Sequence, residues 1–249
     1  MMSFPIKFIK PTLLNDESIS SWFSLRNHES VHPELNIPGL NLGLNTEEDE
    51  EIILQNRRLL LDEIGLNTHQ IAYAIQVHKT KIEVVQHSGT YTNTDAFVTA
   101  KTNLALAIQV ADCAAVLFAD PKNRVIAAAH AGWRGAAGNI IPKTLIKMIS
   151  LGAEIKNIKA FISPCISLKN FEVGEEVAAQ FPDKFVDRNN YEKPHVDLKK
   201  FIRHQLLEQG MMESKIELDI HCTINDEQFY SYRRQKEKSG RMMGIIKLN

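Results

Sequence analysis

The chain has 249 residues, a net charge of −1 at pH 7 and a hydrophobic fraction of 44%. This balanced charge gives no electrostatic reason to expect nucleic acid or an anionic membrane as a partner, and no apolar stretch approaches the roughly 20 residues that span a bilayer. Three cysteines, an odd number, argue against a disulfide framework. We therefore expect a cytoplasmic protein in a reducing compartment.

The apolar pattern predicts one helix, then many strands, then a mixture of both. An acidic segment at 42–51 leads into a helix at about 47–64. Short apolar runs, separated by turn-like pieces such as 87–95, then predict strands at 70–77, 82–86, 96–99, 104–110, 114–119 and 125–129. The pattern continues with helices at about 136–150, 173–180 and 197–209 and strands at about 158–163 and 216–222. This order predicts a single α+β (mixed α/β) domain over residues 1–249, with mixed β-sheets flanked by helices.

Two histidines and one cysteine stand at or beside the ends of these apolar runs. His78 follows one predicted strand, Cys113 precedes another and His130 ends a third. Each residue alone has an ordinary structural explanation, since cysteine is often a small core residue. Together they form a set that zinc uses when three protein groups bind it and one position stays open. Copper is less well supported, because none of the nine histidines forms an H-x-H pair.

Two charged residues lie beside these candidate ligands. Arg134 stands in a Gly-Trp-Arg-Gly turn that leads from His130 into a predicted helix. It could bind an anion there or be a solvated surface charge. Asp112 precedes Cys113, and if the pair ends a strand, their side chains point to opposite sides. Asp112 could then hold a neighbouring backbone group or a base while Cys113 binds the metal.

A second metal motif is present at residues 28–32. The sequence HESVH matches the H-E-x-x-H pattern of zinc metalloproteases, which requires a helix to place both imidazoles on one face. Pro33 follows His32 directly and disfavours helical geometry at His32. We therefore expect a loop here and no metal site.

Several motifs together resemble one widespread bacterial family. They are FSLRN and NLG near the N-terminus, QVH, TDAFVT, ADCAAVLF, AHAGWRG, ISPCISLKNFEVGEEV, and FYSYRR followed by SGR. The chain resembles the laccase-domain (YfiH-type) family, also called multicopper polyphenol oxidases, and the similarity runs nearly end to end. The family is viewed as zinc-dependent purine nucleoside enzymes, and a human macrophage protein shares the domain.

The resemblance implies a fold, a site and an activity. The fold would be the mixed α/β fold of some toxin-type cysteine deamidases, and the zinc ligands and catalytic residues would be His78, Cys113 and His130. The activity would be phosphorolysis of adenosine, inosine and methylthioadenosine, together with hydrolytic deamination of adenosine. The expected partners are purine nucleosides and phosphate, bound by a monomer. The candidate residues for binding substrate or phosphate are Arg26, Asn41, Arg57, Arg134 and Arg233.

Other hypotheses remain open at this point. A cysteine-type amidase or hydrolase, such as one that edits peptidoglycan precursors, would use Cys113 as nucleophile and His130 as base. A binding or redox module without turnover is the third possibility. We expect Cys165 to be structural, and Asp95 to orient a ligand or a turn.

Overall fold

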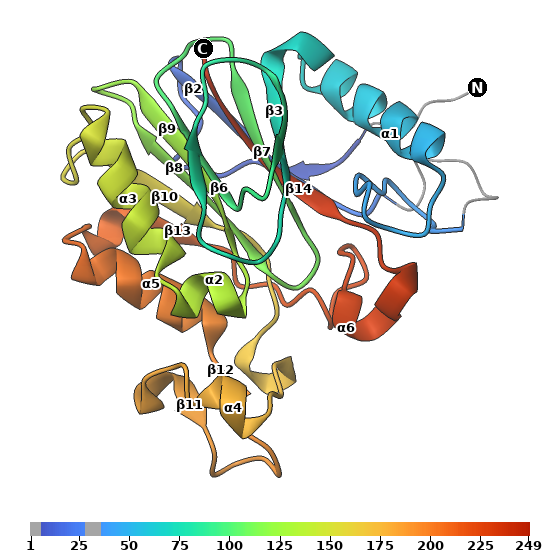
Figure 1. Cartoon of the computed structure of the whole chain (residues 1–249), viewed down its shortest axis with the longest axis vertical. Coiled ribbons are helices and arrows are strands. Elements are labelled where there is room, and N and C mark those ends of the chain that lie inside the picture. Colours follow the sequence, from blue (N-terminus) through green and yellow to red (C-terminus); the bar gives the residue numbers. More distant parts are fainter. Residues whose placement is uncertain (1–5, 28–35) are drawn as a thin grey trace.

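Two six-stranded β-sheets pack face to face and carry helices on their outer faces (Figure 1). The computed structural model describes residues 6–27 and 36–249. The HESVH segment at 28–32, expected to be a loop, lies outside the described residues. No helix among the described residues combines the length and apolar character needed to cross a membrane.

The first sheet is mixed and has the order β1-β2-β14-β7-β3-β5. Its strands are β1 (Phe8–Ile9), β2 (Ile19–Ser24), β3 (Ile71–Ile75), β5 (Gly89–Thr92), β7 (Ala105–Val110) and β14 (Met242–Leu248). β14 runs antiparallel to both β2 and β7, whereas β3 runs parallel to β5 and β7. Segments from the two ends of the sequence therefore meet in the middle of this sheet.

The second sheet is also mixed, with the order β13-β10-β8-β9-β6-β4. Its strands are β4 (Ile82–Val84), β6 (Ala96–Thr99), β8 (Ala114–Asp120), β9 (Val125–Ala131), β10 (Lys159–Ile162) and β13 (Ile216–Leu218). The antiparallel pair β8 and β9 forms its centre. A separate two-stranded sheet joins β11 (Val186–Asp187) and β12 (His195–Val196).

Helices cover the outer face of each sheet. α1 (Glu50–Glu63) packs on the first sheet through Leu60 and Leu61. α2 (Trp133–Ala137), α3 (Ile140–Ser150) and α5 (Leu198–Glu208) pack on the second (Figure 1). The remaining helices, α4 (Glu175–Ala178) and α6 (Tyr232–Gln235), have only four residues each.

The central strands are buried on both faces. In β8, Val116 and Phe118 join the core under the helices, whereas Leu117 and Ala119 join the core between the sheets. This alternation follows from the two-residue period of a strand. A strand with two buried faces reads as a continuous apolar run, which is why the sequence predicts these strands.

The α+β prediction is confirmed, and three local differences have physical causes. The helix expected at 47–64 begins at Glu50 because Asp49 caps it, its side chain accepting the N–H of Glu51 at 2.7 Å. The helix expected at 136–150 is divided because Asn139 has a left-handed φ of 63°. The stretch 87–95, expected to be a turn, contains β5, so that expectation is wrong. β5 is a largely exposed edge strand and therefore lacks the apolar pattern by which strands were predicted. The apolar pattern also missed β1, β2, β11, β12 and β14.

Gly244 provides a test of how tightly the sheets pack. A methyl group at this position of β14 would lie 2.9 Å from the Cβ of Ala115 in β8. We expect Gly244→Ala to lower the free energy of unfolding by about 1–3 kcal/mol, measured by urea denaturation, because overpacking forces the backbone to shift. Adding Ala115→Gly should recover part of this loss. Simple addition of two losses in the double variant would contradict the packing explanation.

Candidate metal centre and its cavity

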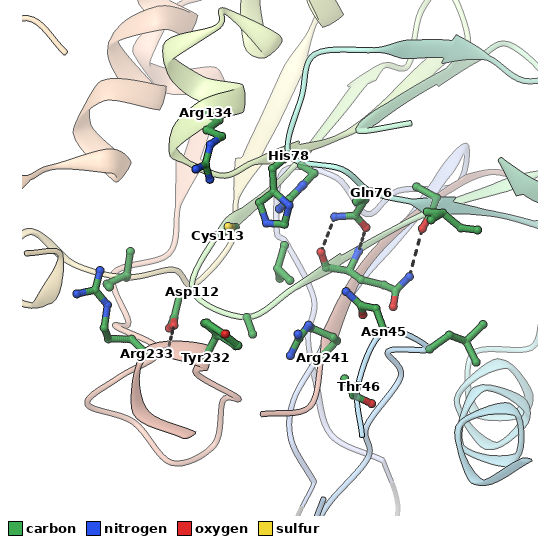
Figure 2. Close-up of a pocket in the computed structure, with 18 of the residues that line it drawn as sticks. Asn45, Thr46, Gln76, His78, Asp112, Cys113, Arg134, Tyr232, Arg233 and Arg241 are labelled. Atoms are coloured by element: carbon green, nitrogen blue, oxygen red, sulfur yellow. Dashed lines mark hydrogen bonds between the residues drawn. The ribbon is translucent and has the colours of Figure 1, made fainter. Parts of the chain in front are cut away.

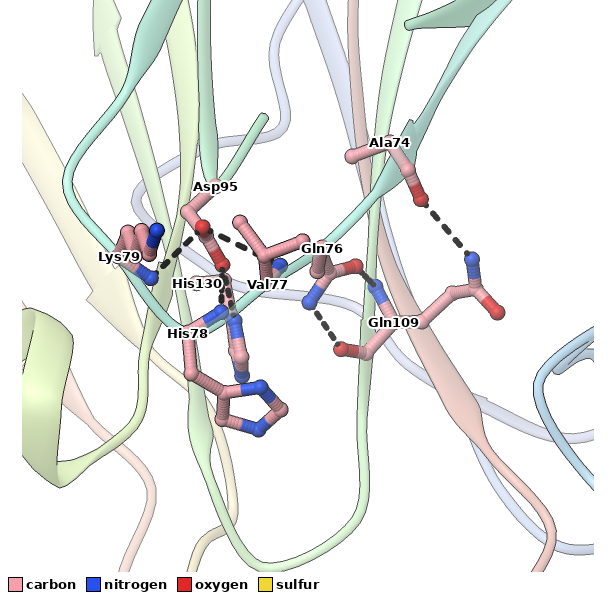
Figure 3. A network of polar contacts seen from close by, with 8 residues as sticks. All are labelled: Ala74, Gln76, Val77, His78, Lys79, Asp95, Gln109 and His130. Atoms are coloured by element: carbon pink, nitrogen blue, oxygen red, sulfur yellow. Dashed lines mark hydrogen bonds and ion pairs between the residues drawn. The ribbon is translucent and has the colours of Figure 1, made fainter. Parts of the chain in front are cut away.

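His78, Cys113 and His130 come together although they are distant in sequence. Figure 2 shows His78 beside Cys113, and Figure 3 shows His78 beside His130. Their ligand atoms all lie within 4.8 Å of one another. The pairing of β8 with β9 sets Ala115 opposite His130, so Cys113, just before β8, comes beside His130. His78 arrives from the loop that follows β3. Three adjacent nitrogen and sulfur donors form a group that could hold a metal ion.

One carboxylate orients two of these three residues (Figure 3). Asp95 Oδ1 lies 2.9 Å from His130 Nδ1, so this nitrogen donates to Asp95 and Nε2 is left for a ligand. The same carboxylate accepts the backbone N–H groups of Val77, His78 and Lys79. These bonds hold His78 at a left-handed φ of 59°. The geometry agrees with the expectation that Asp95 orients a ligand or a turn.

The electrostatics of the group favour a thiolate beside an imidazolium. Burial raises the pKa of Cys113, but the charges of His130 and His78 and their hydrogen bonds outweigh it and bring the pKa to about 6. Burial lowers the pKa of His130, yet the Cys113 charge and the Asp95 hydrogen bond raise it to about 9. A thiolate is the form that binds metals and the form that attacks electrophiles. By contrast, burial raises the pKa of Cys165 to about 12, which agrees with a structural role.

Gly132 leaves the space that the group needs. A methyl group there would lie 2.9 Å from Cys113 Sγ and 3.3 Å from His78 Cδ2. Its φ of −75° is ordinary, so the requirement for glycine is one of volume and not of backbone freedom. Gly132 therefore serves the approach of the three side chains. The turn predicted at 132–135 is wrong, because Gly132 caps helix α2 and residues 133–137 are helical.

A cavity of about 950 Å³ opens around the three residues. Aromatic and aliphatic side chains form much of its wall, including Tyr73, Trp133, Ile166, Phe171 and Leu198. The charged residues that line it are Glu47, Arg57, Asp112, Arg134, Arg233, Glu237 and Arg241. Its size and its mixture of apolar walls with a few polar groups are typical of small-molecule sites.

Three of the five expected substrate or phosphate residues reach this cavity. Arg57, Arg134 and Arg233 line it, but neither Arg26 nor Asn41 is among the described lining residues. The Nε of Arg26 donates to the carbonyl of Pro38, and its guanidinium lies 5.3 Å from the centroid of the Tyr230 ring. Asn41 is fully buried and bonds within the protein. The sequence patterns did not single out Arg241, which lines the cavity from the position just before β14.

Asp112 holds the segment 223–233 beside the cavity through two hydrogen bonds. It lies between β7 and β8, outside both strands, with a left-handed φ of 76°. Its two carboxylate oxygens accept the hydroxyl of Thr223 and the backbone N–H of Arg233, both at 2.6 Å. Asp112 thus holds a backbone group from a segment distant in sequence, which is one of the alternatives left open by the sequence.

Two glutamines connect the first sheet to the cavity wall. Gln76, from the QVH motif, pairs its side-chain amide with the backbone N–H and carbonyl of Gln109, each at 2.8 Å (Figure 3). Gln109 in turn donates to the carbonyl of Ala74. Nothing in the local sequence pattern singled out this arrangement, because it depends on β3 and β7 being neighbours.

Residues 21–249 match the family model described as multi-copper polyphenol oxidoreductase laccase. The chain belongs to this family. It is similar to a purine nucleoside phosphorylase of Corynebacterium glutamicum, with 36% identity over 213 residues that cover 83% of this chain and 85% of the relative. It is also similar to a purine nucleoside phosphorylase of Bacteroides thetaiotaomicron, with 30% identity over an alignment that covers 95% of this chain and 96% of the relative.

Solved structures with this laccase-family fold superpose closely. The hypothetical protein YfiH of Bacillus licheniformis gives a TM-score of 0.86 at 28% identity, with 93% of each chain covered. A Neisseria meningitidis protein gives 0.84 at 29% identity, covering 97% of this chain and 99% of the other. The predicted family resemblance is therefore confirmed.

Asp95 allows a test of the candidate metal centre. Asp95→Asn removes the anion that orients His130 and the loop at 77–79, so we expect metal affinity to fall about 10- to 100-fold. Competition with a chelator of known affinity measures this. Asp120 is the matched control, because its buried carboxylate also accepts backbone N–H groups but lies at the other end of β8. Asp120→Asn should cost stability and leave metal affinity unchanged; an equal loss of affinity in both variants would refute the assignment.

Proposed function

We propose that this protein is a zinc-dependent purine nucleoside phosphorylase that also deaminates adenosine. The observation that carries the proposal is the His78–Cys113–His130 group facing a cavity with four arginines. The names of the relatives from two bacterial groups support the phosphorylase activity. In the proposal, phosphate attacks C1′ of the ribose and the bond from C1′ to the purine breaks.

The donor set supports zinc as the metal. Two imidazoles and a thiolate match zinc sites with one open position, and the Asp95 hydrogen bond to His130 is the usual outer support of such a ligand. Copper has less support, because within residues 6–27 and 36–249 this is the one cluster of three or more possible ligands. When bound, zinc supplies a Lewis acid that can activate water for deamination.

The chain's own residues would bind and orient the substrate. Trp133 and Phe171 offer aromatic surfaces for a purine base, and Arg57, Arg134 and Arg233 offer positive charge for phosphate. The exposed Arg134 stacks on Trp133, with its guanidinium carbon 4.3 Å from the centroid of the ring. Arg26 and Asn41 would support this site from outside the cavity wall.

A cysteine hydrolase is the second candidate, favoured by one specific observation. The lowered pKa of Cys113 and the raised pKa of His130 describe a thiolate–imidazolium pair, which is the resting form of many cysteine nucleophiles. The two candidates differ in what the thiolate does. In the first it binds zinc, and in the second it attacks the substrate.

The first test is metal content together with turnover. We expect about one zinc per chain, measured by metal analysis, because the three residues complete one site. Cys113→Ala should lose zinc and activity together. Release of the base from inosine should require phosphate, and conversion of adenosine to inosine should not. Full zinc content in Cys113→Ala, or base release without phosphate, would contradict the proposal.

The second test measures the reactivity of Cys113. Bound zinc should protect the thiolate, so iodoacetamide should modify Cys113 slowly in the metal-loaded protein and faster after chelation. Mass spectrometry of the Cys113 peptide gives the rate, and the buried Cys165 serves as an unreactive reference. Fast modification that does not depend on the chelator would favour the cysteine hydrolase.

A further inference from the structure

Arg241 differs from the other arginines of the cavity in how its guanidinium is held. Its Nη1 donates to the backbone carbonyls of Ser239 and Gly240, while the described residues give no hydrogen bond to its Nε or Nη2. Arg57 uses its Nε for the carbonyl of Leu42, and Arg233 uses Nη2 for that of Glu172. Arg241 therefore keeps the complete Nε–Nη2 edge, the fork that binds a phosphate or carboxylate through two parallel hydrogen bonds.

The backbone of Arg241 is fixed by the Asn41-Leu42-Gly43 step. The Oδ1 of Asn41 accepts the N–H of Arg241 at 2.9 Å and that of Gly43 at 3.1 Å. Leu42 donates its N–H to the carbonyl of Arg241 at 3.1 Å. A methyl group on Gly43 would collide with Cγ of Arg241, so the arginine side chain passes directly over this glycine. Residues 41–43 therefore fix the backbone of Arg241 so that its side chain points into the cavity.

The surroundings of Arg241 keep it charged and available. Burial lowers the pKa of Arg241, but the nearby Cys113, Tyr232 and Asp112 act in the opposite direction, and an arginine remains protonated at neutral pH. Within the described part of the chain no carboxylate lies within ion-pair distance of it. Figure 2 shows it on the cavity wall below Cys113 and Asp112, beside Tyr232. A half-buried, immobilised cation with no ion-pair partner among the described residues attracts an anion.

We propose that the free edge of Arg241 forms an oxyanion subsite for a phosphate group, with Asn41 as its positioning residue. The inference rests on the proposed phosphorylase function, in which the group is the inorganic phosphate that attacks the nucleoside. A nucleoside 5′-monophosphate carries the same group, so it is the alternative source. The exposed Arg134, which stacks on Trp133, would then guide phosphate toward the cavity instead of holding it at the reacting centre.

Calorimetric titration of the metal-loaded protein with inorganic phosphate tests the subsite without any turnover. We expect Arg241→Gln to weaken phosphate binding by about tenfold or more, because two charge-assisted hydrogen bonds are lost. Arg241→Lys should show a smaller loss, since it keeps the charge without the fork. Arg203→Gln is the control for net charge, because Arg203 lies outside the cavity and pairs with Glu213.

The outcomes separate the subsite from the proposed function. Unchanged phosphate affinity in a folded Arg241→Gln protein would overturn the subsite, even if nucleosides are turned over. Loss of phosphate binding in a protein that turns over no nucleoside would support the subsite and refute the phosphorylase. If adenosine 5′-monophosphate binding falls and phosphate binding does not, the co-substrate assignment is overturned. If Arg241→Gln does not fold, Arg241→Lys must still weaken phosphate binding severalfold for the proposal to stand.

The role of Asn41 is tested by comparing how its substitution changes the KM for phosphate and the KM for the nucleoside. Asn41→Leu should raise the KM for phosphate severalfold and leave the KM for the nucleoside within about twofold, because the acceptor that holds Arg241 and the Gly43 turn beneath its side chain is lost. A merely structural role would lower the melting temperature and affect both substrates equally. That result would remove Asn41 from the proposal.

Discussion

The geometry of the centre depends on the carboxylate of Asp95. A buried anion is costly unless donors satisfy it, and here three consecutive backbone N–H groups and the His130 ring do so. Hydrogen bonds hold the pKa of Asp95 below its ordinary value although burial acts to raise it. Because one group fixes both the loop that carries His78 and the ring of His130, neither can move without leaving Asp95 partly unsatisfied. The cavity is built around this fixed point.

Three arginines of the cavity are held by hydrogen bonds to main-chain carbonyls. Arg57, Arg233 and Arg241 each donate to at least one carbonyl. Outside the cavity both kinds of partner occur: Arg188 and Arg203 pair with carboxylates, whereas Arg234 donates to carbonyls. Carbonyl partners orient a guanidinium without cancelling its charge, so these three arginines can still interact with an anionic ligand.

Sequence patterns predicted the parts of the structure that depend on burial. The strands around 96–99 and 114–119 were predicted because both faces are buried, and His130 and Cys113 were found because they border such runs. β2 was missed because buried serines interrupt its apolar residues, with Ser24 accepting the backbone N–H of Met243. Arg241 was missed for a different reason. Its surroundings depend on Asn41, far away in the chain, and no local spacing reports that contact.

The position of β14 affects how the protein can be made. This strand lies between β2 and β7, so the first sheet cannot be completed until residues 242–248 have been synthesised. Until then, two central strands present unpaired backbone groups on facing edges, which is a template for association between nascent chains. Folding of this sheet must therefore wait until the chain has been synthesised through β14. Chaperones that cover strand edges during translation would raise the yield of folded protein. Arg241 directly precedes this strand, so the cavity also lacks one of its arginines until the sheet can be completed.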